Sequence, residues 1–142
     1  MITVSPELVD RTISEFGACG AGRRECVVYW LARQSDPDRV VEVAHPRHTS
    51  SAFGYAVDGG WLTEFFFRLA DDGLTAVAQT HTHPGECVDH SNTDDEFVLV
   101  PSPGFVSIVL PDFARHFERG RCAVHVLDAS GAWRLDPAVV AW

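Results

Sequence analysis

Residues 80–96, Thr-His-Thr-His-Pro-Gly-Glu-Cys-Val-Asp-His-Ser-Asn-Thr-Asp-Asp-Glu, follow an apolar run at residues 74–78 that is typical of a buried strand. His81 and His83 stand near the end of this strand. Side chains two residues apart on a strand share one face, so both imidazoles can bind the same atom. The Pro-Gly pair that follows predicts that the strand ends there and that the chain turns.

Ser91 and Asp94 come after this turn, three residues apart. A helix beginning at Ser91 would place Asp94 on its first turn, from which the carboxylate can reach back toward His81 and His83. Two imidazoles and one carboxylate form a three-ligand zinc site that leaves the fourth position to water, as a catalytic zinc requires. The pattern therefore indicates a catalytic metal site.

The same segment allows other interpretations. The spacing of Ser91 and Asp94 also fits a helix capping box, in which the carboxylate would bind only backbone N–H groups. Cys87, Asp89 and His90 lie between the turn and Ser91 and are rival ligands. From the residues alone, these alternatives stay open.

Length and composition limit the class of protein. A chain of 142 residues with 46% hydrophobic residues predicts a single folded domain over residues 1–142. No apolar run has membrane-spanning length, and the N-terminus lacks the pattern of a signal peptide. The formal net charge of −9 disfavours nucleic acid and anionic membranes as partners, and favours a basic or mixed protein surface.

Four cysteines are present, without a C-x-x-C pair or the spacing of a disulfide framework. Such usage is typical of reduced thiols, so we expect a cytoplasmic protein. They are Cys19, Cys26, Cys87 and Cys122.

The remaining pattern alternates helices with strands and predicts an α/β fold. Ser5, followed by proline and glutamate, is a helix start, and Asp58 can cap a second helix. We expect a helix from residue 6 that stops between residues 17 and 20, a second helix from about residue 59 to residue 70, a turn at 36–38, and strands at 24–33, 39–44, 74–83, 105–110, 122–127 and 132–135.

Glu25 is a carboxylate at the start of the apolar run that follows it. It is either a solvated strand end beside two arginines or a functional acid. His45 and His48 could suggest a second metal site, but no acid or cysteine completes one, so we expect both in a loop.

The run His-x-His-Pro-x6-Ser-x2-Asp resembles the signature of the JAMM (MPN-plus, JAB domain) zinc metallopeptidases, in particular the short bacterial members associated with ubiquitin-like conjugation systems. The resemblance implies a three-layer MPN fold, similar to that of cytidine deaminases, with a mixed central sheet flanked by helices. It also implies one zinc ion per chain held by His81, His83 and Asp94, with Glu25 as general base and Ser91 as oxyanion donor.

The resemblance further implies a peptidase or isopeptidase that cuts after the C-terminal tail of a ubiquitin-like protein, with E1-like and E2-like enzymes as possible partners. Processing of a sulfur-carrier protein and a non-catalytic zinc-binding scaffold are the alternatives. A zinc deaminase would need a Pro-Cys-x-x-Cys motif, which the sequence lacks.

Overall fold

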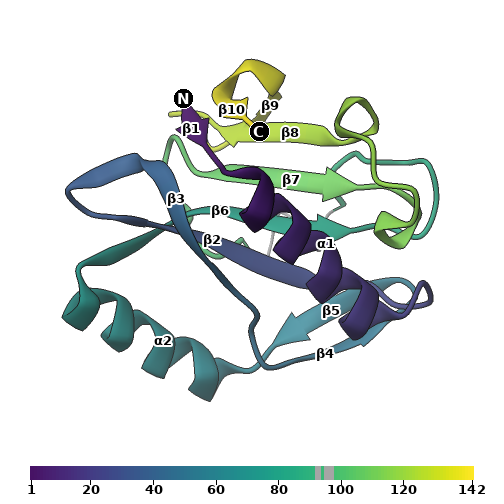
Figure 1. Cartoon of the computed structure of the whole chain (residues 1–142), viewed down its shortest axis with the longest axis horizontal. Coiled ribbons are helices and arrows are strands. Elements are labelled where there is room, and N and C mark those ends of the chain that lie inside the picture. Colours follow the sequence, from purple (N-terminus) through teal and green to yellow (C-terminus); the bar gives the residue numbers. More distant parts are fainter. Residues whose placement is uncertain (92–93, 95–97) are drawn as a thin grey trace.

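The computed structural model of the chain describes residues 1–91, 94 and 98–142. Its centre is an eight-stranded mixed sheet with the order β10-β1-β3-β2-β6-β7-β8-β9 (Figure 1). The strands are β1 (Ile2–Thr3), β2 (Val27–Arg33), β3 (Asp36–Ala44), β6 (Leu74–Thr82), β7 (Val106–Leu110), β8 (Ala123–Leu127), β9 (Trp133–Leu135) and β10 (Val140–Ala141). A separate hairpin contains β4 (His48–Ser51) and β5 (Gly54–Val57), and the two helices are α1 (Pro6–Gly20) and α2 (Gly59–Asp72).

Alternation along β2 divides the core into two layers, because successive side chains of a strand point to opposite faces. Val28 and Trp30 pack in the cluster that contains Phe16 of α1. Tyr29 and its neighbours on the other face pack with Phe65 of α2. The sheet is therefore covered by one helix on each face, which confirms the predicted three-layer α/β fold.

Both helices begin where the sequence predicts. The Ser5 hydroxyl accepts the N–H of Leu8 at 3.4 Å, with Pro6 in the first turn, and the Asp58 carboxylate accepts the N–H of Trp61 at 2.7 Å. α2 ends at Gly73, whose φ of 64° is a left-handed conformation that glycine adopts without strain.

β6 lies inside the sheet, antiparallel to β2 and parallel to β7. In the β2–β6 register, Val27 is opposite His81 and Val28 is opposite Thr80. Just before β2 begins, the Cys26 carbonyl still accepts the N–H of Thr82, the last residue of β6, at 3.1 Å. The chain that carries the two histidines is thus fixed by main-chain hydrogen bonds along one of the best-buried strands of the fold.

Some predicted details were wrong. The β2–β3 turn is at residues 34–35 rather than 36–38, since Asp36 already pairs with Arg33. His48, expected in a loop, begins β4, and no sequence pattern predicts the β4–β5 hairpin, whose residues are all half-buried or exposed. The helix expected from Ser91 falls mostly on residues 92–93 and 95–97, which lie outside the described residues.

The prediction of reduced thiols is also wrong for one pair of cysteines. Cys19 and Cys26 form a disulfide, with their Cα atoms 6.3 Å apart, whereas Cys87 and Cys122 are free. Among the described residues, no helix is long and apolar enough to cross a membrane.

Candidate metal centre

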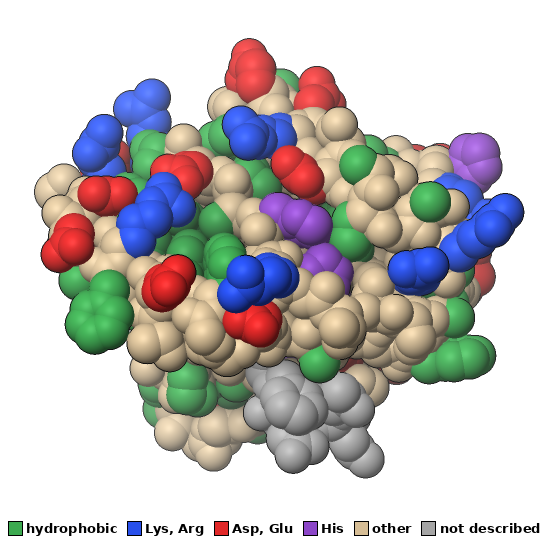
Figure 2. All heavy atoms as spheres, turned by 90° about the horizontal axis from the view of Figure 1, so that it is seen from below, with side chains coloured by type: hydrophobic (Ala, Val, Ile, Leu, Met, Phe, Trp, Pro, Cys, Tyr) green, Lys and Arg blue, Asp and Glu red, His purple; other side chains and the backbone are tan. Residues whose placement is uncertain are grey.

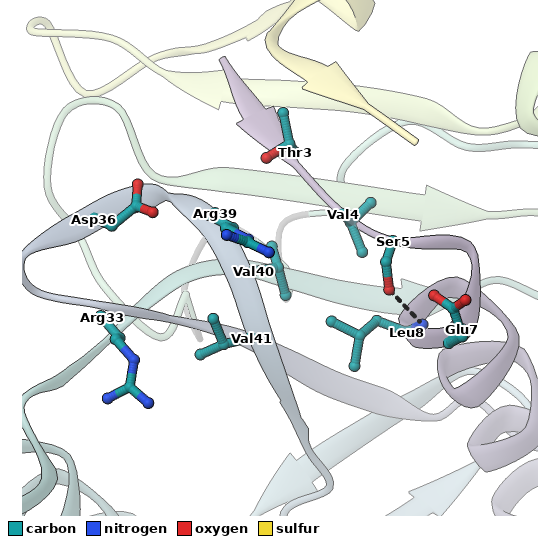
Figure 3. A pocket seen from close by; sticks show the side chains of 10 residues that line it. All are labelled: Thr3, Val4, Ser5, Glu7, Leu8, Arg33, Asp36, Arg39, Val40 and Val41. Atoms are coloured by element: carbon teal, nitrogen blue, oxygen red, sulfur yellow. Dashed lines mark hydrogen bonds between the residues drawn. The ribbon is translucent and has the colours of Figure 1, made fainter.

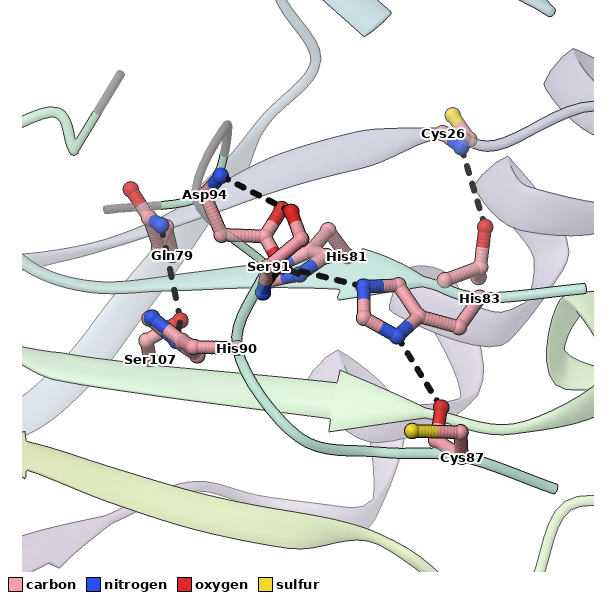
Figure 4. Close-up of polar contacts among 10 residues, drawn as sticks. Cys26, Gln79, His81, His83, Cys87, His90, Ser91, Asp94 and Ser107 are labelled. Carbon is pink, nitrogen blue, oxygen red and sulfur yellow. Dashed lines mark hydrogen bonds and ion pairs between the residues drawn. The ribbon is translucent and has the colours of Figure 1, made fainter. Parts of the chain in front are cut away.

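His81, His83 and Asp94 meet at the end of β6 and are almost fully buried, with exposures of 0%, 8% and 5% (Figure 4). Oδ2 of Asp94 lies 3.3 Å from Nε2 of His81 and 3.1 Å from Nε2 of His83. The two imidazoles are brought together by the period-2 geometry of the strand, as predicted. Three metal-binding atoms therefore converge on one point.

The hydrogen bonding of His83 shows which of its nitrogens is available as a ligand. Nδ1 lies 3.0 Å from the carbonyl oxygen of Cys87. A carbonyl can only accept, so Nδ1 donates its proton, and in neutral imidazole Nε2 then carries the lone pair. That lone pair faces the Asp94 carboxylate, so the two acceptors need a shared proton or a cation between them.

His81 also supports the presence of a cation. Its side chain is completely buried; Nδ1 has no hydrogen-bond partner among the described residues, and Nε2 makes no well-formed hydrogen bond there although it lies 3.3 Å from the Asp94 carboxylate. Buried polar atoms without partners are costly and rare in folded proteins. A divalent metal bound by Nε2 satisfies one of them, and two imidazoles with one carboxylate are a donor set that suits zinc. The residues therefore fit the metal that the sequence implies.

Asp94 is placed both to cap the backbone at Ser91 and to bind a metal, the two roles that the sequence allows. Its Oδ2 accepts the N–H of Ser91 at 2.8 Å, and its own N–H donates to Oγ of Ser91 at 3.1 Å, as in a capping box. The same Oδ2 faces the two histidines. Burial alone would raise the pKa of Asp94, but contacts with His81 and His83 outweigh burial and hold that pKa well below its usual range. The cap thus orients an ionised carboxylate toward the metal position.

Glu25 lies on the same side of the sheet as the two histidines. The register that pairs Val27 with His81 continues to Glu25 and His83, and residues opposite each other across strands share a face. Glu25 is only 5% exposed, and burial raises its pKa to about 7, with Asp94 raising it further and His83 lowering it. Its N–H is anchored on the Ser51 carbonyl at 2.8 Å. Glu25 is thus a buried acid beside the cluster, not the solvated strand end that was one alternative.

The rival ligands do not join the cluster. Cys87 contributes its carbonyl oxygen rather than its thiol, and its side chain is exposed, as is that of Asp89. Nε2 of His90 lies 2.8 Å from Oγ of Ser107, and the His90 ring packs against His125 and Trp133.

Tyr55 is a neighbour of the site that the sequence analysis did not identify. Its ring centroid lies 5.8 Å from that of His81, and burial raises the pKa of its hydroxyl well above the usual value. It comes from the hairpin that no sequence signal predicted. Tyr55 also lines a cavity of about 200 Å³ next to the cluster, together with Tyr29, Val57, Leu62, Phe66, Val98 and Leu99.

A larger hollow of about 760 Å³ lies elsewhere, between the start of α1 and the β2–β3 hairpin (Figure 3). Its charged lining residues are Glu7, Arg33, Asp36 and Arg39, and it contains none of the histidines. On the face shown in Figure 2, acidic and arginine side chains are mixed around histidine side chains, without a broad patch of one sign. We therefore place the candidate site at the metal-binding atoms of His81, His83 and Asp94, and not in the larger hollow.

Comparisons with known proteins agree with this site. No protein-family model matches the chain. A protein of Sinorhizobium fredii named "Probable metalloprotease y4jG" is 31% identical over 145 residues, which cover 98% of this chain and 89% of that protein.

Three solved structures share the fold. A Desulfitobacterium hafniense protein has a TM-score of 0.70 at 14% identity, covering 99% of this chain and 93% of its own. A Salinibacter ruber protein has a TM-score of 0.64 at 18% identity, covering 96% and 88%. A JAB1/MPN domain protein of Archaeoglobus fulgidus has a TM-score of 0.56 at 12% identity, covering 99% and 97%. Taken with the curated relative and the buried histidine and aspartate cluster, they show that the chain belongs to the JAMM/MPN metalloprotease family.

Proposed function

We propose that this protein is a zinc-dependent isopeptidase that cuts after the C-terminal tail of a ubiquitin-like protein. The observation that carries the proposal is the convergence of His81, His83 and Asp94 beside a buried Glu25. A ligand set with an open position, next to an acid whose pKa is near neutrality, is the arrangement that metal-assisted hydrolysis requires. The cytoplasmic location stays a prediction.

The residues divide the chemistry between them. Zinc held by His81, His83 and Asp94 would supply Lewis acidity toward water and the scissile carbonyl. Glu25 accepts the proton of the attacking water and then delivers it to the leaving amine. The Ser91 hydroxyl can donate to the developing oxyanion. The Asp94 N–H binds a lone pair of the Ser91 oxygen, so this bond does not use the hydroxyl proton.

The position beside His83 is not open to an added strand. β6 pairs with both β2 and β7, and the His83 N–H donates to the Leu110 carbonyl at 2.9 Å. β5 has no partner but β4 among the described strands, and it carries Tyr55 next to His81. An extended tail can therefore pair with β5. The cavity of about 200 Å³ lined by Tyr55 has room for one apolar side chain of that tail.

The net charge of −9 favours a substrate whose tail or surface carries arginine. Such attraction weakens as salt is added. E1-like and E2-like enzymes are the partners that this proposal implies. Processing of a sulfur-carrier protein would use the same chemistry on a different carrier, whereas a non-catalytic scaffold would bind zinc without hydrolysis.

The proposal is tested with a ubiquitin-like carrier fused through its native tail to a second protein, and with a sulfur-carrier fusion of the same design. We expect cleavage of the first fusion after its tail, loss of cleavage with a zinc chelator, and recovery with added zinc. Alkylation of the non-reduced protein, which modifies only Cys87 and Cys122, should leave activity intact because no thiol acts as nucleophile.

Loss of activity on alkylation, with activity retained in chelator, would contradict the metal mechanism. Equal cleavage of fusions with unrelated tails would contradict the proposal of a ubiquitin-like substrate, but not the metal mechanism. Preference for the sulfur-carrier fusion would favour that alternative.

Glu25→Gln should retain zinc but lose nearly all hydrolysis, because the substitution removes the base and no ligand. Glu86→Gln is the matched control, since Glu86 lies in the loop after His83 and its side chain is 85% exposed. Zinc content and kcat are measured on both variants. Parental turnover in zinc-loaded Glu25→Gln would show that Glu25 is not the base.

Ser91→Ala should lower kcat about a hundredfold, the usual effect of removing one oxyanion donor, with little change in KM. Ser91→Thr, which keeps the hydroxyl, should stay close to the parent. Both variants are assayed at equal zinc content, so that loss of the Asp94 cap is not mistaken for loss of the donor. Equal kcat values for the alanine and threonine variants would exclude the oxyanion role.

Glu25→Gln should also change how the stability of the metal-free protein depends on pH. The pKa of Glu25 is raised by burial from 4.5 to about 7, so the folded chain binds more protons than the unfolded chain between these values. Parental stability therefore falls as pH rises through this window. Relative to the parent, we expect the free energy of unfolding of Glu25→Gln to increase by up to about 3 kcal/mol between about pH 4 and pH 8. Urea denaturation in the presence of a chelator measures the free energy of unfolding of both proteins. A difference between them that does not change with pH would show that burial does not raise the pKa of Glu25.

A further inference from the structure

A second cluster of metal-binding side chains lies on the α1 side of the sheet. It consists of Cys19 in the last turn of α1, Cys26 before β2, and His45 and His48 at the β3–β4 connection. Their ligand atoms all lie within 4.8 Å of one another. The expectation that no cysteine accompanies these histidines was therefore wrong, because residues 19 to 29 positions away complete the group.

Two sulfur-to-nitrogen distances suit tetrahedral coordination, whereas the two sulfurs are bonded to each other in the disulfide and must separate before both can bind one ion. Sγ of Cys19 lies 3.3 Å from Nε2 of His48, and Sγ of Cys26 lies 3.3 Å from Nε2 of His45. A tetrahedral zinc with Zn–S bonds of about 2.3 Å and Zn–N bonds of about 2.0 Å keeps sulfur and nitrogen about 3.5 Å apart. The two rings are nearly perpendicular, at 87°, so each approaches the centre from its own direction.

His48 is oriented by a hydrogen bond from its other nitrogen, and His45 has a carboxylate near its own. Nδ1 of His48 lies 2.8 Å from the Pro46 carbonyl oxygen and must donate to it, which leaves the lone pair on Nε2. Nδ1 of His45 lies 3.9 Å from the Glu15 carboxylate. Carbonyls and carboxylates behind the imidazole are the usual support of metal-binding histidines.

We propose that Cys19, Cys26, His45 and His48 bind a structural zinc ion when the two cysteines are thiolates. Two thiolates and two imidazoles form a closed tetrahedral set, unlike the open set at His81. The disulfide and the zinc complex exclude each other, because each uses both sulfurs. Zinc binding to the newly made chain needs no redox step: two thiols release their protons to water as the sulfurs bind the ion. Reopening the disulfide takes two electrons and two protons, which a phosphine and water supply as the phosphine becomes its oxide.

This zinc would position the general base. The N–H of Cys26 donates to Oγ1 of Thr82 at 2.9 Å, and the N–H of Thr82 donates back to the Cys26 carbonyl. Thr82 separates His81 from His83, and Cys26 directly follows Glu25. The two metal positions therefore lie on opposite faces of one strand pair, and an ion bound at Cys26 restrains the segment that carries Glu25.

The experiment counts zinc in protein purified with a phosphine reductant and without chelator. We expect two zinc ions in the parent, and one in Cys19→Ser, His48→Ala and Asp94→Ala. Cys122→Ser is the matched control, since Cys122 is also half-buried but lies outside the cluster, and it should hold two. These variants avoid the fully buried Cys26, whose replacement endangers folding.

Cobalt substitution identifies the ligands without relying on activity. Asp94→Ala, loaded with cobalt, should show near-ultraviolet thiolate charge-transfer absorption and strong tetrahedral visible bands, and the double variant Cys19→Ser/Asp94→Ala should lose both. Reduced Asp94→Ala that binds no metal, or Cys19→Ser with the zinc content of the parent, would overturn the proposal. Because Asp94→Ala lacks the first centre, these results do not depend on whether the protein is an isopeptidase.

Discussion

The antiparallel pairing of β2 with β6 is the constraint on which the site depends. Its register places Val27 opposite His81, and therefore Glu25 beside His83, so the acid and the imidazoles share one face. A shift of one residue would turn Glu25 to the α1 side and remove it from the histidines. The residues of β2 that share this register are buried in both core layers, Val28 and Trp30 on the α1 side and Tyr29 on the α2 side, before the register shifts between Trp30 and Leu31. Packing far from the site thus determines its geometry.

The same strand pair accounts for the polar groups that the core tolerates. Buried imidazoles and carboxylates destabilise a fold unless they are paired or bind a metal. Here the two buried ring nitrogens of His81 lack hydrogen bonds among the described residues, and burial raises the pKa of Glu25 to about 7, so both groups destabilise the metal-free chain. A metal ion bound by His81 would satisfy one of its ring nitrogens, and the role of Glu25 as a base accounts for the buried carboxyl. The groups that destabilise the fold therefore lie where the chemistry is proposed.

The features that the sequence predicted are those encoded within a few residues. His81, His83, Ser91 and Asp94 lie within one short segment, and their spacing on a strand and a helix start was enough to bring them together. The cap of α2 at Asp58 was likewise local. The Cys19 to His48 contact could not be predicted, because it depends on how α1 packs against the β3–β4 connection. Tyr55 was missed for a similar reason: its short hairpin carries no continuous apolar pattern, and its place beside His81 is set by tertiary packing.

The most direct test of the central claim is a crystal structure of zinc-loaded protein with anomalous diffraction measured on both sides of the zinc absorption edge. We expect an anomalous peak bonded to Nε2 of His81, Nε2 of His83 and a carboxylate oxygen of Asp94, with the Glu25 carboxylate facing the open coordination position. A structure in which zinc occupies other ligands and leaves these three side chains unbound, or in which Glu25 points away from the ion, would contradict it.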